Sequence, residues 1–213
     1  MVKQERAVRT RQALLQAAAV EFDRYGYDGT SLSAVSKAAG LSIGAVTFHF
    51  PTKVHLADAV QEEGRSVTVA ALERLAAEPM TPLRMVIDLT LELTRLMEQE
   101  PAVRSAIRLS RERPSTVSWS DAWLPTVRSL LDRAYESGQL HTDALPADVT
   151  TLVEHLTSGA EAYLRSRMGS DPAFESAVAQ LKRVWRLALA GVSAEGPTVP
   201  RQTGATESPA ERS

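Results

Sequence analysis

Residues that favour the α-helix dominate almost the whole chain, and Gly and Pro lie mainly at the ends of periodic segments. Strict alternation of apolar and polar residues, which marks a half-buried strand, is not evident over any stretch. Gly26, Gly40 and Gly138 stand where helices are expected to stop, and Thr81-Pro82 is a typical helix start. The sequence therefore predicts an all-α protein.

The same signals predict where the helices lie. We expect helices over 4–25, from Ser31 or Ser33 to 39, over 43–48, from 53, and over 62–77, 82–99, 101–109, 123–137, 146–168 and 172–190. A polar loop with Pro is expected over 111–120. Residues 193–213 are rich in Gly, Pro, Ser, Thr and Glu, which predicts a disordered tail.

The charge divides the chain into a short basic part and a larger acidic part. Residues 1–55 contain seven Lys and Arg against four Asp and Glu, a formal charge of +3, and the remaining 17 basic and 22 acidic residues give −5. The whole-chain charge of −2 therefore conceals a basic end. Such asymmetry suggests that one end faces nucleic acid, with random surface charge on a single globule as the alternative. We expect boundaries that separate 1–55, 56–192 and 193–213.

Composition and absent motifs exclude several classes of protein. The chain has no cysteine, which excludes disulfide frameworks, thiolate metal sites and cysteine nucleophiles. No apolar run approaches the ~18 residues of a membrane span, and the N-terminus lacks the apolar core of a secretory signal, so we expect a cytoplasmic protein. The four histidines lack paired metal-ligand spacing, and no phosphate loop, dinucleotide fingerprint or hydrolase motif occurs. We expect no enzymatic activity, no cofactor and no metal.

Residues 32–50, LSAVSKAAGLSIGAVTFHF, fit two short helices joined by a glycine turn. Leu32, Val35 and Ala39 supply an apolar face, and Gly40 allows the left-handed backbone that reorients the chain. This is the arrangement of a helix-turn-helix. Short side chains on the outer side of the second helix let it approach the major groove of DNA closely. These outer positions are Ser42, Gly44 and Thr47.

Each part of the motif also has a plainer interpretation. An Ala-rich helix pair with a Gly turn occurs in bundles that do not bind DNA. His49 is more typical of a capping or packing residue than of a catalytic one. Phe48 and Phe50 are expected in the core rather than as a platform for stacked bases.

A wider set of fixed spacings over residues 9–56 agrees with one family. A helix ends in F-x-x-x-G-Y and is followed by T-S-L, the A-A-G-L-S turn, G-A-V-T-F-H-F and K-x-x-L. In these features the chain strongly resembles the N-terminal domain of the tetracycline-repressor (TetR) family. The resemblance implies an all-helical homodimer. Its N-terminal three-helix unit, residues 1–55, would bind a palindromic operator in double-stranded DNA, and its C-terminal helices, residues 56–192, would bind a small molecule that releases the DNA.

The resemblance also implies which residues contact DNA. Phosphate contacts are expected from Ser31, Ser33 and Lys53, and contacts in or beside the major groove from Ser42, Ile43, Gly44, Thr47 and His49. Thr47 stands where the family usually has Tyr, and Ile43 where relatives often carry a polar or basic residue. An Ile can contact a thymine methyl but cannot hydrogen-bond guanine. The operator preference is therefore expected to differ from that of close relatives. A backbone or minor-groove contact and a solvated helix start stay open for Arg6, Arg9 and Arg11.

Further segments resemble one branch of the family, the γ-butyrolactone autoregulator receptors of antibiotic-producing bacteria and their receptor-like relatives. The similar segments are F-H-F, K-Q-E-R-A-V-R-T-R, V-R-S-A-I-R-L, and D-A-W before a helix that ends S-G-Q-L-H. Trp123 aligns with the tryptophan that lines the ligand cavity of these receptors, and an ordinary core tryptophan is the alternative. The residues expected at the ligand are Trp119, Trp123, Leu83, Ile87, Leu109, Val153 and Thr157.

The polar groups expected of a lactone receptor are few in this chain. Ala160 follows Gly159 where a hydroxyl residue is expected, and Gly64 stands near a position at which receptors carry an amide. Thr157 and His155 are polar candidates for the ligand, with the dimer interface or solvent as alternatives. These departures favour a receptor-like protein that responds to an antibiotic or an intermediate instead of a butyrolactone.

The last two long helices are expected to form a four-helix bundle with those of a second copy. Residues that recur there at helical spacing are candidates for the interface or the buried wall behind it: Leu152, Leu156, Tyr163, Leu181, Trp185 and Leu189. An isologous dimer matches the two-fold symmetry of a palindrome.

The function expected from the sequence is that of a repressor that a small molecule releases from its operator, which controls antibiotic biosynthesis or its regulators. One alternative is a TetR-type regulator of an efflux or catabolic gene that responds to an unrelated apolar ligand. Another is a helical interaction protein that has lost DNA binding, which Ile43 and Thr47 would favour. No membrane partner is expected.

Overall fold

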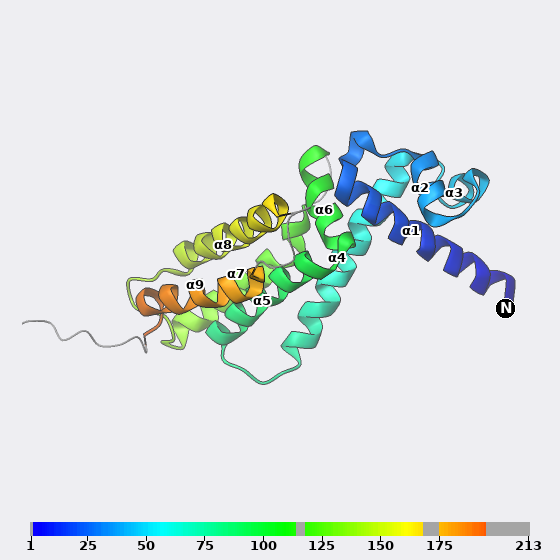
Figure 1. The fold of residues 1–213 in the computed structure, drawn as a ribbon. Helices are drawn as coiled ribbons and strands as arrows, with labels where there is room; N and C mark the ends of the chain where they lie inside the picture. Colours follow the sequence, from blue (N-terminus) through cyan, green and yellow to red (C-terminus); the bar gives the residue numbers. More distant parts are fainter. Residues whose placement is uncertain (1, 114–117, 168–174, 195–213) are drawn as a thin grey trace, which may run out of the picture.

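The computed structural model describes residues 2–113, 118–167 and 175–194, and every regular element in this part of the chain is helical. This confirms the all-α prediction. The helices are α1 (Val2–Gly29), α2 (Leu32–Ala39), α3 (Ile43–His49), α4 (Lys53–Ala76), α5 (Pro82–Gln99), α6 (Pro101–Glu112), the short 3-10 helix η1 (Trp119–Ala122), α7 (Leu124–Glu136), α8 (Pro146–Ser166) and α9 (Ala177–Val192). Figure 1 shows α1, α2 and α3 at one end of an elongated molecule and α5, α7, α8 and α9 at the other.

Side-chain caps begin the three helices that follow α1. The hydroxyl oxygens of Ser31, Ser42 and Thr52 accept hydrogen bonds from the backbone N–H three residues on, at 3.1, 3.2 and 3.3 Å. Each cap satisfies a donor that has no partner inside its helix. The sequence signals for these helix starts are therefore confirmed.

The N-terminal helices enclose a small core of their own. Its buried residues are Leu14, Leu15, Ala18, Ala19, Phe22, Val35, Val46, Phe50, Leu56, Ala57, Val60 and Leu109. The part of α4 up to Val60 belongs to this core, and so does Leu109 of α6. The boundary expected after residue 55 therefore falls inside the single helix α4, which continues without the break expected before residue 62.

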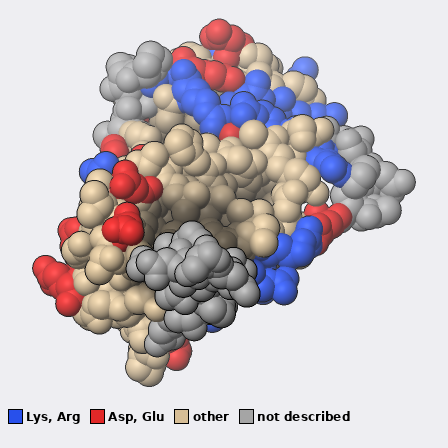
Figure 2. Space-filling view, turned by 90° about the vertical axis from the view of Figure 1, so that its left-hand side faces the viewer, with Lys and Arg blue, Asp and Glu red and all other residues tan. Residues whose placement is uncertain are grey.

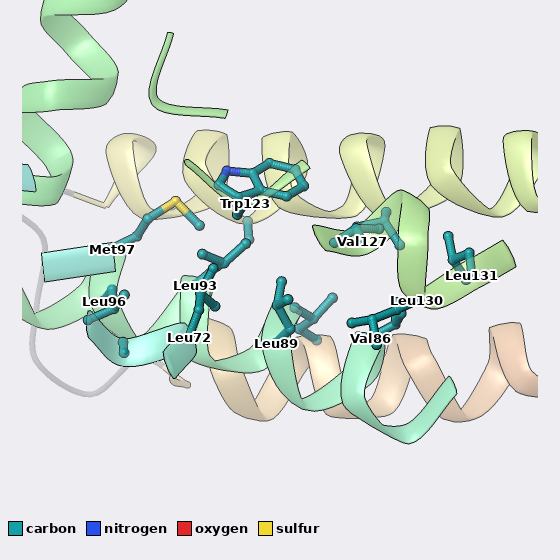
Figure 3. Close-up of a cluster of buried hydrophobic side chains, with 14 of the residues drawn as sticks. Leu72, Val86, Leu89, Leu93, Leu96, Met97, Trp123, Val127, Leu130 and Leu131 are labelled. Atoms are coloured by element: carbon teal, nitrogen blue, oxygen red, sulfur yellow. The ribbon is translucent and has the colours of Figure 1, made fainter. Parts of the chain in front are cut away.

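The larger core lies between α4, α5, α6, α7, α8 and α9. Figure 3 shows part of it, with the labelled side chains of α5 packed against those of α7 and against Trp123. The amphipathic face of α5 supplies much of this core because its apolar residues recur at helical spacing. Its polar residue Thr90 is also buried, and it accepts a hydrogen bond from Nε1 of Trp185 at 2.7 Å.

Helices α4 and α6 approach each other closely at Gly64. A Cβ atom at this position would lie 2.5 Å from the carbonyl oxygen of Ala102 and 2.6 Å from Cβ of Ala106. The absence of a side chain at residue 64, interpreted from the sequence as a missing polar group of the ligand site, thus has a packing reason.

Further boundaries also differ from the sequence prediction. Helix α6 runs on to Glu112, and Trp119 lies in η1 where a loop was expected to continue to residue 120. Ser193 and Ala194, expected in the disordered tail, pair with the segment after α7. The N–H of His141 donates to the carbonyl of Val192 at 2.8 Å, and that of Ala194 to the carbonyl of Gln139 at 3.1 Å. The expected helix start at 171–172 and the rest of the tail, 195–213, lie outside the described residues.

In the part of the chain that the structure describes, no helix is both long and apolar enough to cross a membrane.

Candidate DNA interface and ligand cavity

The turn between α2 and α3 is held by local hydrogen bonds. Gly40 has a φ of 65°, in the left-handed region that favours glycine, and its N–H donates to the carbonyl of Lys37 at 3.1 Å. The hydroxyl of Ser36 donates to the carbonyl of Leu41 at 2.6 Å. Val46 and Phe50 anchor the following helix in the core. The helix-turn-helix geometry is therefore set by residues within the motif itself.

One side of α3 is free of the core and turned to solvent. Ser42, Ile43, Gly44 and Thr47, all expected at the major groove, are exposed on it. The hydroxyl of Thr47 donates back to the carbonyl of Ile43 at 3.2 Å, which holds this side chain against its own helix. The exposed surface of α3 is consequently built from short groups, the branched apolar side chain of Ile43 and the ring of Phe48.

Phe48 was expected in the core, and this expectation is wrong. Its side chain is 78% exposed, whereas that of Phe50 is 2% exposed as expected. Helix α3 has only seven residues, and Val46 already occupies its inner face, so Phe48 projects outward. His49 is half-buried and lies edge-on to Phe48, with ring centroids 5.1 Å apart.

The residues expected at phosphates lie around the starts of α2 and α4. Ser31 and Ser33 are exposed, and the hydroxyl of Ser31 is already engaged as the cap of α2. Lys53 is half-buried, with its ammonium 4.3 Å from the ring centroid of Tyr27 and 3.5 Å from the carbonyl oxygen of Asp28. It therefore ties the start of α4 to the end of α1.

A cavity of about 220 Å³ lies beside the two tryptophans that precede α7. Its lining residues come from α5, α6, η1 and α8 and from the residues next to η1: Met97, Ile107, Ser110, Arg111, Ser118, Trp119, Ser120, Trp123, Thr157, Ser158 and Glu161. The structure therefore brings together three of the residues expected at the ligand, namely Trp119, Trp123 and Thr157. Figure 3 shows the nitrogen side of the Trp123 ring turned toward Met97, another lining residue.

The three tryptophans differ in what their indole nitrogens contact. Nε1 of Trp119 donates to the hydroxyl of Thr68 at 2.9 Å, and Nε1 of Trp185 donates to Thr90 at 2.7 Å. Nε1 of Trp123 is buried and has no hydrogen-bond partner among the described residues. A buried donor without a partner is rare because its desolvation is uncompensated. Trp123, a lining residue of the cavity, thus carries a buried indole N–H without a partner among the described residues.

The other residues expected at the ligand are placed elsewhere. Leu83 and Val153 are buried in the larger core, and Ile87 packs against it. Leu109 is fully buried in the core of the N-terminal unit. Helical spacing indicated that these residues face inward, but it could not say toward which of two cores.

The sequence missed most of the polar lining of the cavity. Arg111 and Glu161 form a two-bond ion pair at 2.8 and 2.6 Å on its wall. Serine hydroxyl groups come from positions 110, 118, 120 and 158. No local motif marks these residues, since they meet only through the packing of α6, η1 and α8.

Helices α8 and α9 present a partly apolar outer surface, but not through all the residues expected at a dimer interface. Leu181 and Trp185 are buried in the chain's own core, which agrees with the second of the two places expected for them, the buried wall behind an interface. The bulky indole ring of Trp185 faces inward, and Val184 and Leu187 on the same helix are exposed instead, Leu187 by 79%. The remaining four expected residues are half-buried: Leu152, Leu156, Tyr163 and Leu189.

Charged groups connect α6 to the end of α1. Arg104 pairs with Asp23 at 2.7 Å, and Arg108 donates to the carbonyl oxygen of Asp23 at 2.8 Å. The N–H of Tyr27 donates to Glu112 at 2.5 Å. Burial raises the pKa of Glu112, but its hydrogen bonds from Arg108 and Tyr27 outweigh burial and leave the pKa below its usual value. A shift of α6 would therefore displace the end of α1 through these contacts.

Comparisons with known proteins agree with this arrangement. Residues 14–60 match the family described as bacterial regulatory proteins, tetR family. The A-factor receptor protein of Streptomyces griseus is 29% identical over 143 residues, which cover 66% of this chain and 49% of that protein. The match thus spans about half the length of that relative.

Solved structures extend the similarity over most of the chain. A γ-butyrolactone receptor, described as an ArpA-like protein, superposes with a TM-score of 0.72 at 27% identity and covers 89% of this chain and 91% of that one. CprB of Streptomyces coelicolor, in complex with its biological operator sequence, gives 0.68 at 27% identity with the same coverage. Another ArpA-like γ-butyrolactone receptor is 30% identical, with a TM-score of 0.66, and covers 84% of this chain and 98% of that one. The chain therefore belongs to the TetR family of bacterial regulatory proteins and resembles its γ-butyrolactone receptors.

Proposed function

We propose that the protein is a cytoplasmic transcriptional repressor, not an enzyme, which binds a palindromic operator as a homodimer and leaves it when a small molecule binds beside Trp119 and Trp123. The observation that carries this proposal is the free face of α3, formed by Ser42, Ile43 and Gly44 with Thr47. A helix whose other face is anchored by Val46 offers this surface to the major groove without disturbing its own core.

The chemistry of α3 favours shape and methyl contacts over base-specific hydrogen bonds. Ile43 is 49% exposed and Phe48 78% exposed, and both suit contact with thymine methyl groups. The cap role of Ser42 and the internal hydrogen bond of Thr47 occupy part of their hydrogen-bonding capacity. We therefore propose an operator in which A·T pairs stand opposite α3.

The effector side of the proposal rests on the unpaired Nε1 of Trp123. A ligand with a carbonyl or ether oxygen at that nitrogen would recover the hydrogen bond that the folded chain lacks. The aromatic faces of Trp119 and Trp123, whose ring centroids lie 5.8 Å apart, suit a flat or cyclic apolar body. Ala160 supplies no hydroxyl where a lactone receptor is expected to have one, which supports an antibiotic or an intermediate as effector, and genes of antibiotic biosynthesis as targets.

The path between the two sites runs through α6. This helix carries Ile107 and Arg111 at the cavity and the Arg104, Arg108 and Glu112 contacts to α1. A ligand that moved α6 would change the position of α1. It would thereby also move the two α3 helices of a dimer relative to each other. Such coupling is reciprocal, so operator binding must weaken effector binding by the same factor.

The dimer is proposed to form through α8 and α9. The exposed Val184 and Leu187 lie on α9, and the half-buried Leu152 and Leu156 on α8. Association of this surface with the same surface of a second copy would remove apolar groups from water. It would also place the two DNA-binding units on the two halves of a palindrome.

A gel-shift titration with DNA from upstream of the protein's own gene tests the proposal, repeated with a panel of lactones and antibiotics. We expect a shift at the mass of a dimer, and release by at least one compound. The Trp123→Phe variant should bind DNA as the wild type does and lose the response to that compound. If the upstream DNA is not bound, or if the variant responds as the wild type does, the corresponding half of the proposal fails.

A further inference from the structure

A second and larger cavity, of about 480 Å³, lies where α1, α5, α6 and α8 meet. Its wall is unusually rich in arginine. Guanidinium groups reach it from α1, α6 and α8: Arg24, Arg104, Arg108, Arg111 and Arg165. Figure 2 shows Lys and Arg side chains gathered in a band on one face of the molecule, beside a hollow of uncharged residues.

The carboxylates of the cavity do not balance its arginines. Asp23, Glu112 and Glu161 face the five guanidinium groups, which leaves a formal charge of +2 on the wall. Arg111 and Arg165 share the single carboxylate of Glu161, at 2.6 and 3.0 Å.

Arg24, one of the five arginines counted in this surplus, belongs to α1 of the DNA-binding unit. It has no ion pair among the described residues, and its guanidinium lies 5.3 Å from the ring centroid of its neighbour Tyr25. A concave wall with a surplus of one charge concentrates ions of the other sign.

The floor of this cavity is apolar. Met97 is 1% exposed and Leu164 is half-buried, and both line it. The volume lies in the range of clefts that hold small organic molecules, about 300–1,000 Å³. A bare inorganic ion would leave this floor uncovered, whereas a molecule with an apolar body and an anionic head would meet both parts of the wall.

We propose that this cavity is a second ligand site, which binds an organic anion with an apolar body, such as an aromatic or acyl carboxylate or sulfonate. Arginine suits such a head because its planar donors match the oxygens of a carboxylate or sulfonate. The head would lie between Arg24 of α1 and Arg165 of α8, and the body against Met97 and Leu164. An anion held in this way links the DNA-binding unit to the ligand-binding helices.

The site adjoins the cavity at Trp123 and shares three lining residues with it. These residues are Met97, Arg111 and Glu161, of which Arg111 and Glu161 are hydrogen-bonded to each other. The proposal does not depend on what binds at Trp123, and its test includes a variant of that residue.

Two fluorescent probes with the same aromatic body test the site in the full-length protein. 1-Anilinonaphthalene-8-sulfonate carries an anionic head, and N-phenyl-1-naphthylamine lacks it. We expect the sulfonate to bind at least about tenfold more tightly than the neutral probe, because charge-assisted hydrogen bonds form only with the head. Equal affinity for the two probes would overturn the proposal.

The double variant Arg24→Gln, Arg165→Gln should weaken binding of the sulfonate about tenfold and leave binding of the neutral probe unchanged. The matched control is Arg128→Gln, Arg133→Gln, which removes the same charge from two exposed positions of α7 outside this cavity. If both double variants weaken the sulfonate equally, the effect is one of net charge and the site is refuted.

Two single variants complete the test. Arg24→Gln breaks no ion pair among the described residues, so this variant can replace the double variant if the latter is unstable. It should weaken binding of the sulfonate about threefold. Trp123→Phe should leave sulfonate binding unchanged. Loss of sulfonate binding in the Trp123 variant alone would place the probe in the other cavity and refute the second site.

Discussion

Replacing each of the three tryptophans by phenylalanine separates the proposed effector donor from two structural ones. All three side chains are buried, with exposed fractions of 6% for Trp119, 3% for Trp123 and 1% for Trp185. The change from indole to phenyl removes a similar volume from each position. The differences in stability among the variants therefore report mainly on the indole N–H.

The magnitudes follow from the partners of each nitrogen. Trp119→Phe and Trp185→Phe each lose one buried hydrogen bond, which costs about 1 kcal/mol. The threonines left behind still donate to main-chain carbonyls, Thr68 at 2.8 Å and Thr90 at 2.7 Å, so no further penalty arises. Trp123→Phe instead removes an unpaired donor whose burial costs about 1–3 kcal/mol.

Trp123→Phe should therefore be more stable than either of the other variants by about 2–4 kcal/mol. For a protein of this length, 1 kcal/mol shifts Tm by roughly 2–4 °C, so the expected gap in Tm is at least about 4 °C. Thermal unfolding followed by circular dichroism, with urea midpoints as a second measure, gives the comparison. If Trp123→Phe lowers Tm as much as Trp185→Phe does, Nε1 of Trp123 has a partner and the reasoning fails.

Three further predictions concern the junction of the two units and the DNA contacts. Gly64→Ala should lower stability by about 1–3 kcal/mol in thermal melts, because its Cβ would lie 2.5 Å from the carbonyl oxygen of Ala102; an unchanged Tm would mean that α4 and α6 separate freely. Lys53→Ala should weaken binding to all DNA sequences and reduce the salt slope by about 1, and a changed sequence preference at an unchanged slope would exclude a phosphate contact. The lowered pKa of Glu112 contributes stability above the usual carboxyl pKa of about 4.3, which is lost as pH falls through the folded value. Tm of Glu112→Gln should therefore fall less than that of the wild type between neutral pH and pH ~3, and parallel curves would contradict this.

Local signals in the sequence predicted the DNA-binding unit well. Gly40, Ser42 and Thr52 each act on residues three or four positions away, so the turn and the helix starts can be predicted without knowledge of distant contacts. Phe48 shows the limit of such reasoning. A short helix with aromatic residues near its end does not reveal which of them faces inward until the position of α1 is known.

The cavities depend on contacts between distant parts of the chain. Trp123 was predicted from a resemblance, but its unpaired nitrogen follows from the packing of α5, α6 and α8 around it. Arg111 meets Glu161 across 50 positions of sequence, and no spacing rule indicates such a pair. Leu109 was expected at the ligand and lies in the other core because α6 spans both.

The central claim, that the exposed face of α3 holds DNA, is tested most directly at Gly44. A Cβ at this position would meet only Ser42 Oγ, at 3.9 Å, so a side chain fits there without disturbing the fold. In gel shifts with the upstream DNA at fixed salt, Gly44→Ala should retain binding, whereas Gly44→Glu should abolish it by setting a carboxylate against the DNA, with both variants at least as stable as the wild type in thermal melts. Binding of Gly44→Glu as tight as that of the wild type would contradict the claim.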